Sequence, residues 1–349
     1  MQDILDQLRV WAEAGHEIAL ATVVSTWGSS PRAVGAHMAV RADAAMVGSV
    51  SGGCVEGAVV QEALEILAGS PSKLLRFGVS DETAWDVGLA CGGSIEVFVQ
   101  PFNADLLDPL KDSITARLTR CIATVIAGPE RMLGALGIFD RERLVAGGWP
   151  DELGEESPGW IAAALEHASP CREKAWVDAE SVEVFIDVLR PAPTLIMIGG
   201  VHISVALGAM ARALGYRTVV IDPRKSFATT ERFPAIDQLI QSWPEEGLET
   251  VGIDASTAIA VLTHDPKIDD PAIKLALRSP AFYVGALGSR TTHARRVERL
   301  LQDGLNVELL ARLRAPIGLD LGGRTPEEIA LSIMAEITAT RHGGLASGT

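Results

Sequence analysis

The hydrophobic pattern is most regular in the C-terminal half of the chain. From residue 193 onward, short apolar runs alternate with segments of helical periodicity, and the runs cover residues 194–199, 217–222, 258–263 and 281–287. Continuous apolar runs are typical of strands that are buried on both faces of a parallel sheet, with helices as the crossover connections. We therefore predict a Rossmann-like, doubly wound parallel sheet over residues 191–349.

The last helix of this half has a clear start signal. Thr325, Pro326 and Glu328 are the residue types expected at the N-cap, N1 and N3 positions of a capping box. The apolar residues that follow recur at helical spacing, which predicts a buried stripe of Ile329, Ile333, Met334 and Ile337.

The N-terminal half reads as a mixed α/β domain over residues 1–105. Residues 2–14 have the spacing of an amphipathic helix, residues 18–24 that of a strand, and residues 95–99 alternate as a second strand does. Residues 106–190 alternate short apolar runs with turn-rich stretches, including an acidic one at 147–158. We predict a strand-containing connector with an exposed acidic loop there.

Two cysteines lie in matching Gly-rich turns. Cys54 follows Gly52 and Gly53 and precedes a helical pattern that begins near Glu56, while Cys91 is followed by Gly92 and a strand. Glycines allow positive φ and close approach of a ligand. The unpaired N–H groups and dipole of a helix start favour a thiolate, so we expect Cys54 to be reactive, with Cys91 sharing its site.

A structural role for these thiols is the alternative, because free cysteine is usually buried as a small hydrophobic residue. Cys121 lies in an apolar run and Cys171 in a segment that reads as a polar loop, and neither has the Cys-Gly context. We interpret Cys121 and Cys171 as structural or incidental.

Polar residues follow the predicted strands of the C-terminal half. Ligands of open α/β sheets bind at the carboxyl ends of the strands, so these residues are expected along one crevice. Asp222 has the position of an acceptor for a ribose-like diol, and Arg224 and Arg290 are candidates for holding a phosphate. The full set of candidates in this crevice is Gly199, Gly200, His202, Asp222, Arg224, His264, Asp265, Ser289 and Arg290.

The dinucleotide fingerprint in this region is incomplete. Val201 stands where the second glycine should let the backbone approach a pyrophosphate, and Ser204 stands at the third glycine position. The crevice residues also have plain structural interpretations: Asp222 with Arg224 as a turn with a solvated salt bridge, and His264 with Asp265 as a capped strand end. The charges of Arg295, Arg296 and Arg299 are those of a solvated helix face.

Composition narrows the classes of function. The chain has 349 residues and a net charge of −15, which argues against binding to nucleic acid or an anionic membrane surface. No apolar run is long enough to span a bilayer, the start of the chain lacks signal-peptide features, and four scattered cysteines form no disulfide or zinc pattern. We expect a cytoplasmic protein with free thiols.

Several motifs in order resemble those of the XdhC/CoxI family, the xanthine dehydrogenase accessory proteins. They are the Ser-Gly-Gly-Cys-Val-Glu of residues 51–56, the Cys-Gly-Gly of 91–93, the Asp-Pro-Arg of 222–224, the Thr-His-Asp of 263–265, and longer matches over 282–290 and 318–328. The chain departs from the family's usual Gly-Ala-Gly-His by having Gly-Gly-Val-His at 199–202.

The resemblance implies a chaperone for the molybdenum cofactor. Such proteins bind and protect the cofactor while a cysteine desulfurase supplies its sulfido ligand, and they deliver it to the apoenzyme of a molybdenum hydroxylase such as xanthine or carbon monoxide dehydrogenase. Molybdenum in a pterin dithiolene suits thiolate contact, which makes Cys54 the candidate metal ligand or sulfur-handling group, with Cys91 beside it. The crevice residues would hold the phosphate end of the pterin or its nucleotide form. Beside the two cysteines, the candidates for cofactor binding are Gly52, Gly53, Glu56 and Gly92.

Two other functions stay open. The first is an NAD(P)-dependent oxidoreductase that uses the Rossmann-like domain, against which Val201 counts. The second is a thiol relay in which Cys54 and Cys91 cycle through a disulfide. A site built from Gly-rich turns is often closed by another copy of the chain, which makes a homodimer plausible, although no interface stripe can be read.

Overall fold

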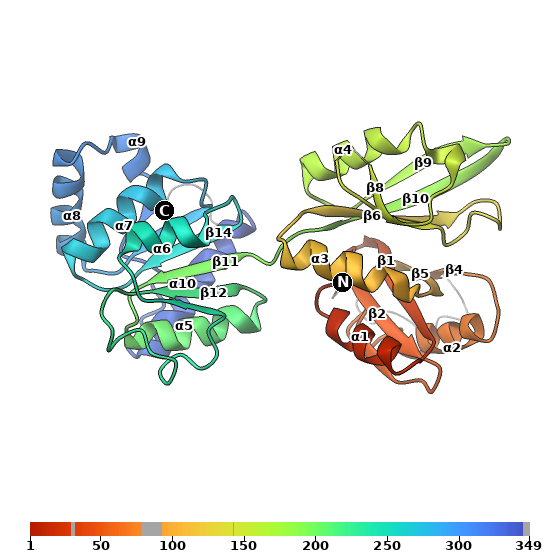
Figure 1. Ribbon diagram of the computed structural model, residues 1–349, viewed down its shortest axis with the longest axis horizontal. Coiled ribbons are helices and arrows are strands. Elements are labelled where there is room, and N and C mark those ends of the chain that lie inside the picture. Colours follow the sequence, from red (N-terminus) through yellow and green to blue (C-terminus); the bar gives the residue numbers. More distant parts are fainter. Residues whose placement is uncertain (29–31, 79–92, 142, 345–349) are drawn as a thin grey trace. The chain divides into compact units, whose positions relative to one another are not determined.

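The computed structural model describes residues 1–28, 32–78, 93–141 and 143–344. It divides into two compact units, Met1–Pro191 and Ala192–Thr349 (Figure 1). Cys91 and Gly92, two of the predicted site residues, lie outside the described residues. The fold class is as predicted: a mixed α/β N-terminal part and a parallel sheet at the C-terminus.

An antiparallel sheet of five strands forms the first half of the N-terminal unit. Its strand order is β3-β2-β1-β5-β4, with β1 Ile18–Trp27, β2 His37–Arg41, β3 Met46–Gly48, β4 Lys73–Phe77 and β5 Ser94–Pro101. Two helices accompany this sheet, α1 Leu5–Glu13 and α2 Glu56–Leu67. The predicted order of helix, strand, Gly-rich turn, helix and strand is confirmed.

Residues 106–190 contain a second complete sheet. Its strand order is β8-β7-β6-β10-β9, with β6 Arg120–Ala127, β7 Leu136–Phe139, β8 Leu144–Gly147, β9 Cys171–Val177 and β10 Glu180–Leu189. The helical segments that follow β5 are η1 Ala104–Leu106, α3 Leu107–Thr115, η2 Asp151–Leu153 and α4 Ser157–His167. The prediction of a polar loop at Cys171 is wrong, because this residue starts β9 and pairs with Ile186 of β10.

The two sheets of the N-terminal unit are packed face to face between helices. Helix α2 covers the outer face of the first sheet through Val59 and Ala63, and α4 covers the second through Ile161 and Ala164. The facing surfaces meet in a shared apolar cluster of Val24, Phe98, Ile126 and Phe185. Helices α1 and α3 join residues of both sheets in a further apolar cluster, so α2 and α4 lie on the outer faces, and α1 and α3 lie beside the facing surfaces (Figure 1).

The C-terminal unit is a parallel sheet of six strands between helices. The order is β13-β12-β11-β14-β15-β16, with β11 Thr194–Ile198, β12 Arg217–Ile221, β13 Gln238–Ile240, β14 Thr257–Val261, β15 Tyr283–Ala286 and β16 Leu313–Arg314. Its helices are α5 His202–Ala213, α6 Pro244–Val251, α7 Pro266–Arg278, α8 Arg290–Gln302, α9 Val307–Leu310 and α10 Pro326–Arg341. Separate apolar cores fill the two faces of the sheet, so the strand order and layering are those of a dinucleotide-binding fold.

The start of α10 carries the predicted capping box. The Thr325 hydroxyl accepts from Glu328 N–H at 3.2 Å, and the Glu328 carboxylate accepts from Thr325 N–H at 3.0 Å. We expect Thr325→Ala to lower the free energy of unfolding of this unit by about 1 kcal/mol. Urea unfolding would measure this change, with Thr325→Ser as the control that keeps the hydroxyl. Equal stabilities of the two variants would contradict the capping role.

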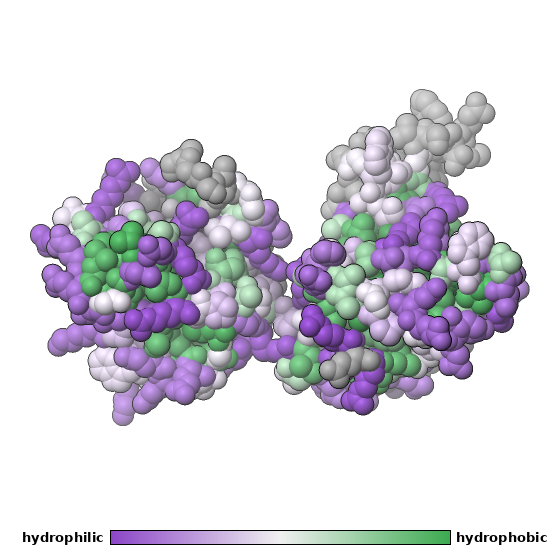
Figure 2. Space-filling view, turned by 90° about the horizontal axis from the view of Figure 1, so that it is seen from above, coloured by the Kyte–Doolittle hydropathy of each residue, from purple (hydrophilic) through white to green (hydrophobic). Residues whose placement is uncertain are grey.

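Hydrophilic residues cover most of the face shown in Figure 2, and apolar residues form separate patches on it. Within the part of the chain that the structure describes, no helix has both the length and the apolar character needed to cross a membrane.

Candidate functional site

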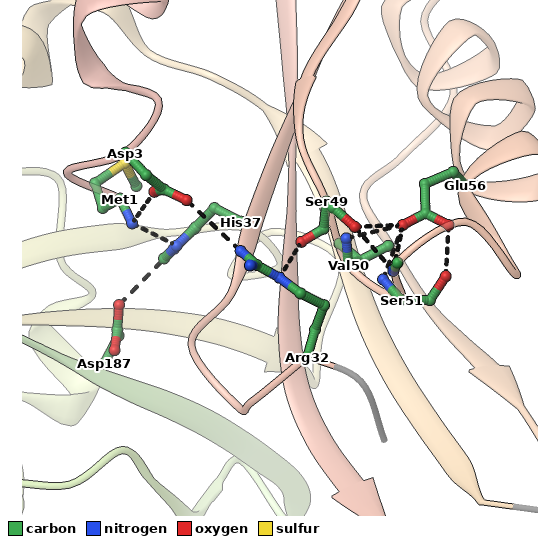
Figure 3. Close-up of polar contacts among 10 residues, drawn as sticks. Met1, Asp3, Arg32, His37, Ser49, Val50, Ser51, Glu56 and Asp187 are labelled. Carbon is green, nitrogen blue, oxygen red and sulfur yellow. Dashed lines mark hydrogen bonds and ion pairs between the residues drawn. The ribbon is translucent and has the colours of Figure 1, made fainter. Parts of the chain in front are cut away.

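The turn before Cys54 is wrapped around the carboxylate of Glu56. Glu56 Oε1 accepts from the N–H groups of Ser51 at 2.9 Å and Gly52 at 3.0 Å, and Oε2 accepts from Gly53 N–H at 2.8 Å. A longer contact of 3.3 Å comes from Val50 N–H. The first residue of α2 therefore closes a ring of backbone donors (Figure 3).

Serine hydroxyls complete this arrangement. Ser49 Oγ donates to Glu56 Oε1 at 2.7 Å, and the Ser51 hydroxyl donates to Oε2. Ser51 Oγ in turn accepts from the N–H groups of Cys54 and Val55, both at 2.9 Å. Every backbone N–H from residue 50 to residue 55 is thus used inside the turn.

The hydrogen bonds decide the ionisation of Glu56. Burial alone would raise the pKa of this carboxyl, but donation from the Ser51 and Ser49 hydroxyls and from Ser51 N–H outweighs it and lowers the pKa to about 2. Glu56 is therefore an ionised residue that is only 7% exposed. Its contacts make it a residue that holds the turn, and they leave its carboxylate no free direction toward a ligand.

Cys54 is held at the outer edge of this turn with its side chain half-buried. Gly52 and Gly53 have φ of 78° and 118°, as their positions in the sequence predict. A Cβ built on Gly53 would meet no atom within 4 Å, so the backbone beside the thiol borders open space. The Cys54 side chain also packs against the apolar cluster beneath α2, so the turn holds a partly exposed cysteine on a backbone whose N–H groups are satisfied.

A second layer of polar contacts supports the turn from the side of the sheet. Arg32 Nε donates to the Ser49 carbonyl at 3.1 Å, and Ser49 N–H donates to the carbonyl of His37 in β2 at 3.1 Å. The His37 ring is buried, with Nε2 3.8 Å from Asp187 Oδ2 of β10 (Figure 3). Burial keeps the pKa of His37 well below its usual value, and the charge of Arg32 adds to this effect.

The other described cysteines, Cys121 and Cys171, lie in strands of the second sheet. Cys121 is buried in β6, and burial raises the pKa of its thiol to about 12. Burial, followed by the charge of Glu173, also raises the pKa of Cys171. Both directions disfavour a thiolate.

In the C-terminal unit, the candidate residues gather at the carboxyl ends of four neighbouring strands, as predicted. Gly199, Gly200 and His202 follow β11, Asp222 and Arg224 follow β12, His264 and Asp265 follow β14, and Ser289 and Arg290 follow β15. His202, His264, Ser289 and Arg290 are exposed. Asp265 caps α7 and Ser289 caps α8, so their side chains are used by helix starts.

Asp222 is fully buried and its carboxylate is used by its neighbours. Oδ2 accepts from Gly200 N–H at 2.8 Å and from Arg224 Nη2 at 2.7 Å, while Oδ1 accepts from Arg224 Nε at 2.9 Å. The Arg224 guanidinium also lies 3.8 Å from the centre of the Phe227 ring. Asp222 has no oxygen left for a ribose diol, a geometry that does not favour the dinucleotide enzyme.

The prediction of a solvated face for the arginines of α8 is wrong at Arg296. This side chain is 1% exposed, and its Nη2 lies 3.2 Å from Asp269 Oδ2 and 3.0 Å from the Leu287 carbonyl. Burial raises the pKa of Asp269, although the Thr263 hydroxyl and Arg296 oppose this. Arg299 pairs with Asp270 at 2.7 Å. The arginines therefore join α8 to α7 at the crevice.

Within the described ranges, no group of three or more His, Cys, Asp or Glu side chains is arranged to hold a metal ion. Among the described residues, the candidate site of the N-terminal unit offers the thiol of Cys54, a donor that suits soft metal centres.

Two family models match the chain. A model of the XdhC Rossmann domain matches residues 195–337, and a model of the XdhC and CoxI family matches residues 11–78. The chain belongs to the XdhC and CoxI family. The turn of Cys54 lies in the second matched segment, and the whole crevice lies in the first.

The chain aligns with curated relatives along most of its length. It is 29% identical over 335 residues to a protein of Bacillus subtilis (strain 168) named as a probable xanthine dehydrogenase subunit, with 94% of each chain covered. It is 27% identical over 329 residues to the molybdenum cofactor insertion chaperone PaoD of Escherichia coli (strain K12), with 94% of this chain and 85% of PaoD covered.

A solved structure has the same fold as this chain. A crystal structure of a xanthine dehydrogenase from Bacillus halodurans matches it with a TM-score of 0.77 at 23% sequence identity. The match covers 99% of this chain and 97% of that one.

Proposed function

We propose that this chain is a molybdenum cofactor insertion chaperone for an enzyme of the xanthine dehydrogenase type. The cofactor is cargo that the chain receives, protects and delivers to the apoenzyme of a molybdenum hydroxylase. Family membership supports this class of function, as do the names of the relatives from Escherichia coli and Bacillus subtilis.

The observation that carries the proposal is the half-buried Cys54 on its closed turn. The N–H groups of residues 50–55 are satisfied by Glu56 and Ser51, which leaves the thiol as the group that this turn can offer to a ligand. Thiolate sulfur is a donor suited to soft metal centres.

The donor set of the turn fits a cargo of this kind. A molybdenum held by a pterin dithiolene already has sulfur ligands, so the protein needs to add a single contact, and Cys54 supplies one. The open space beside Gly53 leaves room for a ligand larger than an ion. We assign Cys54 as the metal contact or sulfur-handling group, and Glu56 as a positioning residue for it.

The finer steps extend the proposal. A cysteine desulfurase would supply the sulfido ligand while the cofactor is bound, and a second copy of the chain would close the site. The described cysteines are free, which favours a reducing compartment such as the cytoplasm. In the crevice, Arg290 is exposed at the start of α8 and is the candidate for a phosphate of the cofactor.

Metal and pterin analysis tests the proposal. The wild type and the variants Cys54→Ala and Cys171→Ala would be purified anaerobically from cells supplied with molybdate. We expect molybdenum and pterin together in the wild type and in Cys171→Ala, and loss of both from Cys54→Ala. Activation of a co-expressed xanthine dehydrogenase-type enzyme should fall in the same variant.

Cys171→Ala is the control variant, and two results would contradict the proposal. Cys171→Ala removes a half-buried thiol from β9 and tests whether any cysteine change has the same effect. Equal cofactor content in all three proteins would exclude the role of Cys54. Absence of both molybdenum and pterin from the wild type, in a host that makes the cofactor, would overturn the proposed function.

A further inference from the structure

The C-terminal unit has a cavity at the amino edge of its sheet, opposite the edge where the crevice candidates lie. Its volume is about 270 Å³, which suits a ligand smaller than a drug-sized molecule. It is lined by the start of β15, by residues at and just before β16, and by Thr340 near the end of α10. None of the crevice candidates lines it, so the proposed function does not use it.

Arg312 is fixed at this cavity by backbone carbonyls. Its Nη1 donates to the carbonyls of Leu277 at 2.5 Å and Ser279 at 3.1 Å, and its Nη2 donates to the carbonyl of Ala281 at 2.6 Å. A guanidinium has further N–H groups that these bonds leave unused. The residue is exposed, and no carboxylate pairs with it among the described residues.

Arg314 brings a second guanidinium to the same cavity. It is paired with Gly285 of β15, and its neighbour Leu313 packs in the apolar core on the α7 side of the sheet. Because side chains alternate along a strand, Arg314 lies on the α10 side, where Thr340 also lines the cavity. Arg314 is exposed, and within the described ranges its side chain has no hydrogen bond or ion pair.

Glu336, an acid of α10 on this side of the sheet, is already used. It is 7% exposed, and its Oε2 accepts from the Tyr283 hydroxyl at 2.6 Å and from Gly318 N–H at 2.8 Å. It does not line the cavity. The two arginine charges therefore meet no carboxylate in the cavity lining, although the chain as a whole has a net charge of −15.

Two reachable guanidinium groups without a carboxylate select an oxyanion. Arginine donates strong, charge-assisted and often paired hydrogen bonds to the oxygens of phosphates and carboxylates. Two positive charges attract a dianion more strongly than a monoanion. The small volume of the cavity favours a compact dianion over a large anionic molecule.

We propose that this cavity binds inorganic phosphate as its dianion. Arg314, which has no other partner among the described residues, supplies the main fork of N–H donors, and the preorganised Arg312 supplies the second positive charge. This site is distinct from the crevice, where Arg290 is the candidate for a phosphate of the cofactor.

Calorimetric titration of the full-length wild type with inorganic phosphate tests the proposal. The pH is mildly alkaline, where the dianion predominates, and chloride sets a fixed ionic strength. We expect saturable binding that is at least about tenfold weaker in Arg314→Met, because hydrogen bonds to a charged ligand are lost. Arg314→Lys keeps the charge without the fork, so its affinity should lie between the two. Arg324→Met, which removes an exposed arginine outside the cavity, is the matched control and should bind as the wild type does.

Three results would overturn the proposal. The first is equal affinity of the wild type and Arg314→Met for phosphate, and the second is absence of binding at tens of millimolar phosphate. The third is loss of phosphate binding in Arg290→Met with normal binding in Arg314→Met, which would assign the phosphate to the crevice. None of these results decides the proposed chaperone function, which the molybdenum and pterin content of Cys54→Ala tests.

Discussion

The variant Glu56→Gln is expected to loosen the turn that carries Cys54 and to lower the free energy of unfolding by about 2–4 kcal/mol. The carboxylate accepts from four backbone N–H groups and two serine hydroxyls. An amide in its place would turn an NH2 group toward some of these donors. Urea unfolding would measure the loss, and faster alkylation of Cys54 would report the opened turn.

Glu62→Gln is the matched control, because Glu62 lies on the same helix and pairs with the exposed Lys73 at 2.8 Å. Such surface pairs contribute about 0–1 kcal/mol. If Glu56→Gln lowered the free energy of unfolding no more than Glu62→Gln does, the structural role of Glu56 would be contradicted.

The same variant should remove a pH dependence of stability. The pKa of Glu56 falls from an ordinary 4.5 to about 2 on folding, so its stabilisation is fully present above about pH 4.5 and is lost as the pH falls toward 2. The difference in unfolding free energy between wild type and Glu56→Gln should shrink over this window. A difference that is constant with pH would show that the carboxylate is not the acceptor.

The variant Asp269→Leu is expected to lower the free energy of unfolding of the C-terminal unit by about 3–5 kcal/mol, because it leaves Arg296 buried without its counterion. Neither side chain is appreciably exposed, and their charged atoms are 3.2 Å apart. Chemical unfolding would measure the loss. The further variant Asp269→Leu with Arg296→Met should recover much of it, because a buried ion pair can be replaced by apolar side chains.

Glu298→Ala, on the outer side of α8, is the control for an ordinary surface charge. A contrary result would be that Asp269→Leu lowers the free energy of unfolding no more than this control does. In that case Arg296 is hydrated in solution, and the prediction of a solvated face for α8 is correct.

The C-terminal fold was predictable because its strands are buried on both faces. Residues such as those of β11 and β14 form unbroken apolar runs, and the Thr325 capping box marks α10 directly. The second sheet was harder to predict. Strand β8 is largely exposed, and β9 alternates buried residues with polar ones and with Trp176, which is 74% exposed. Such strands resemble loops in sequence, so their pairing had to come from tertiary contacts.

The candidate site was predictable in position more than in role. The Gly-rich turn, the helix start and the strand ends follow from local patterns. The role of Glu56 depends on how the turn folds back, although an acid at the start of a helix, where negative charge is stabilising, is a signal for it. The pairing of Arg296 with Asp269 joins residues 27 positions apart, and no local pattern reports it.

The carboxylate at the centre of the Cys54 turn has a consequence for selectivity. A ring of backbone N–H groups would ordinarily attract sulfate, phosphate or free molybdate, all of which are tetrahedral oxyanions. Here Glu56 occupies that ring as a built-in competitor, and its negative charge repels anions that approach the turn. We therefore expect the turn to discriminate against inorganic oxyanions, and under the proposed function a ligand would be recognised there through its affinity for sulfur and not through its oxygen atoms.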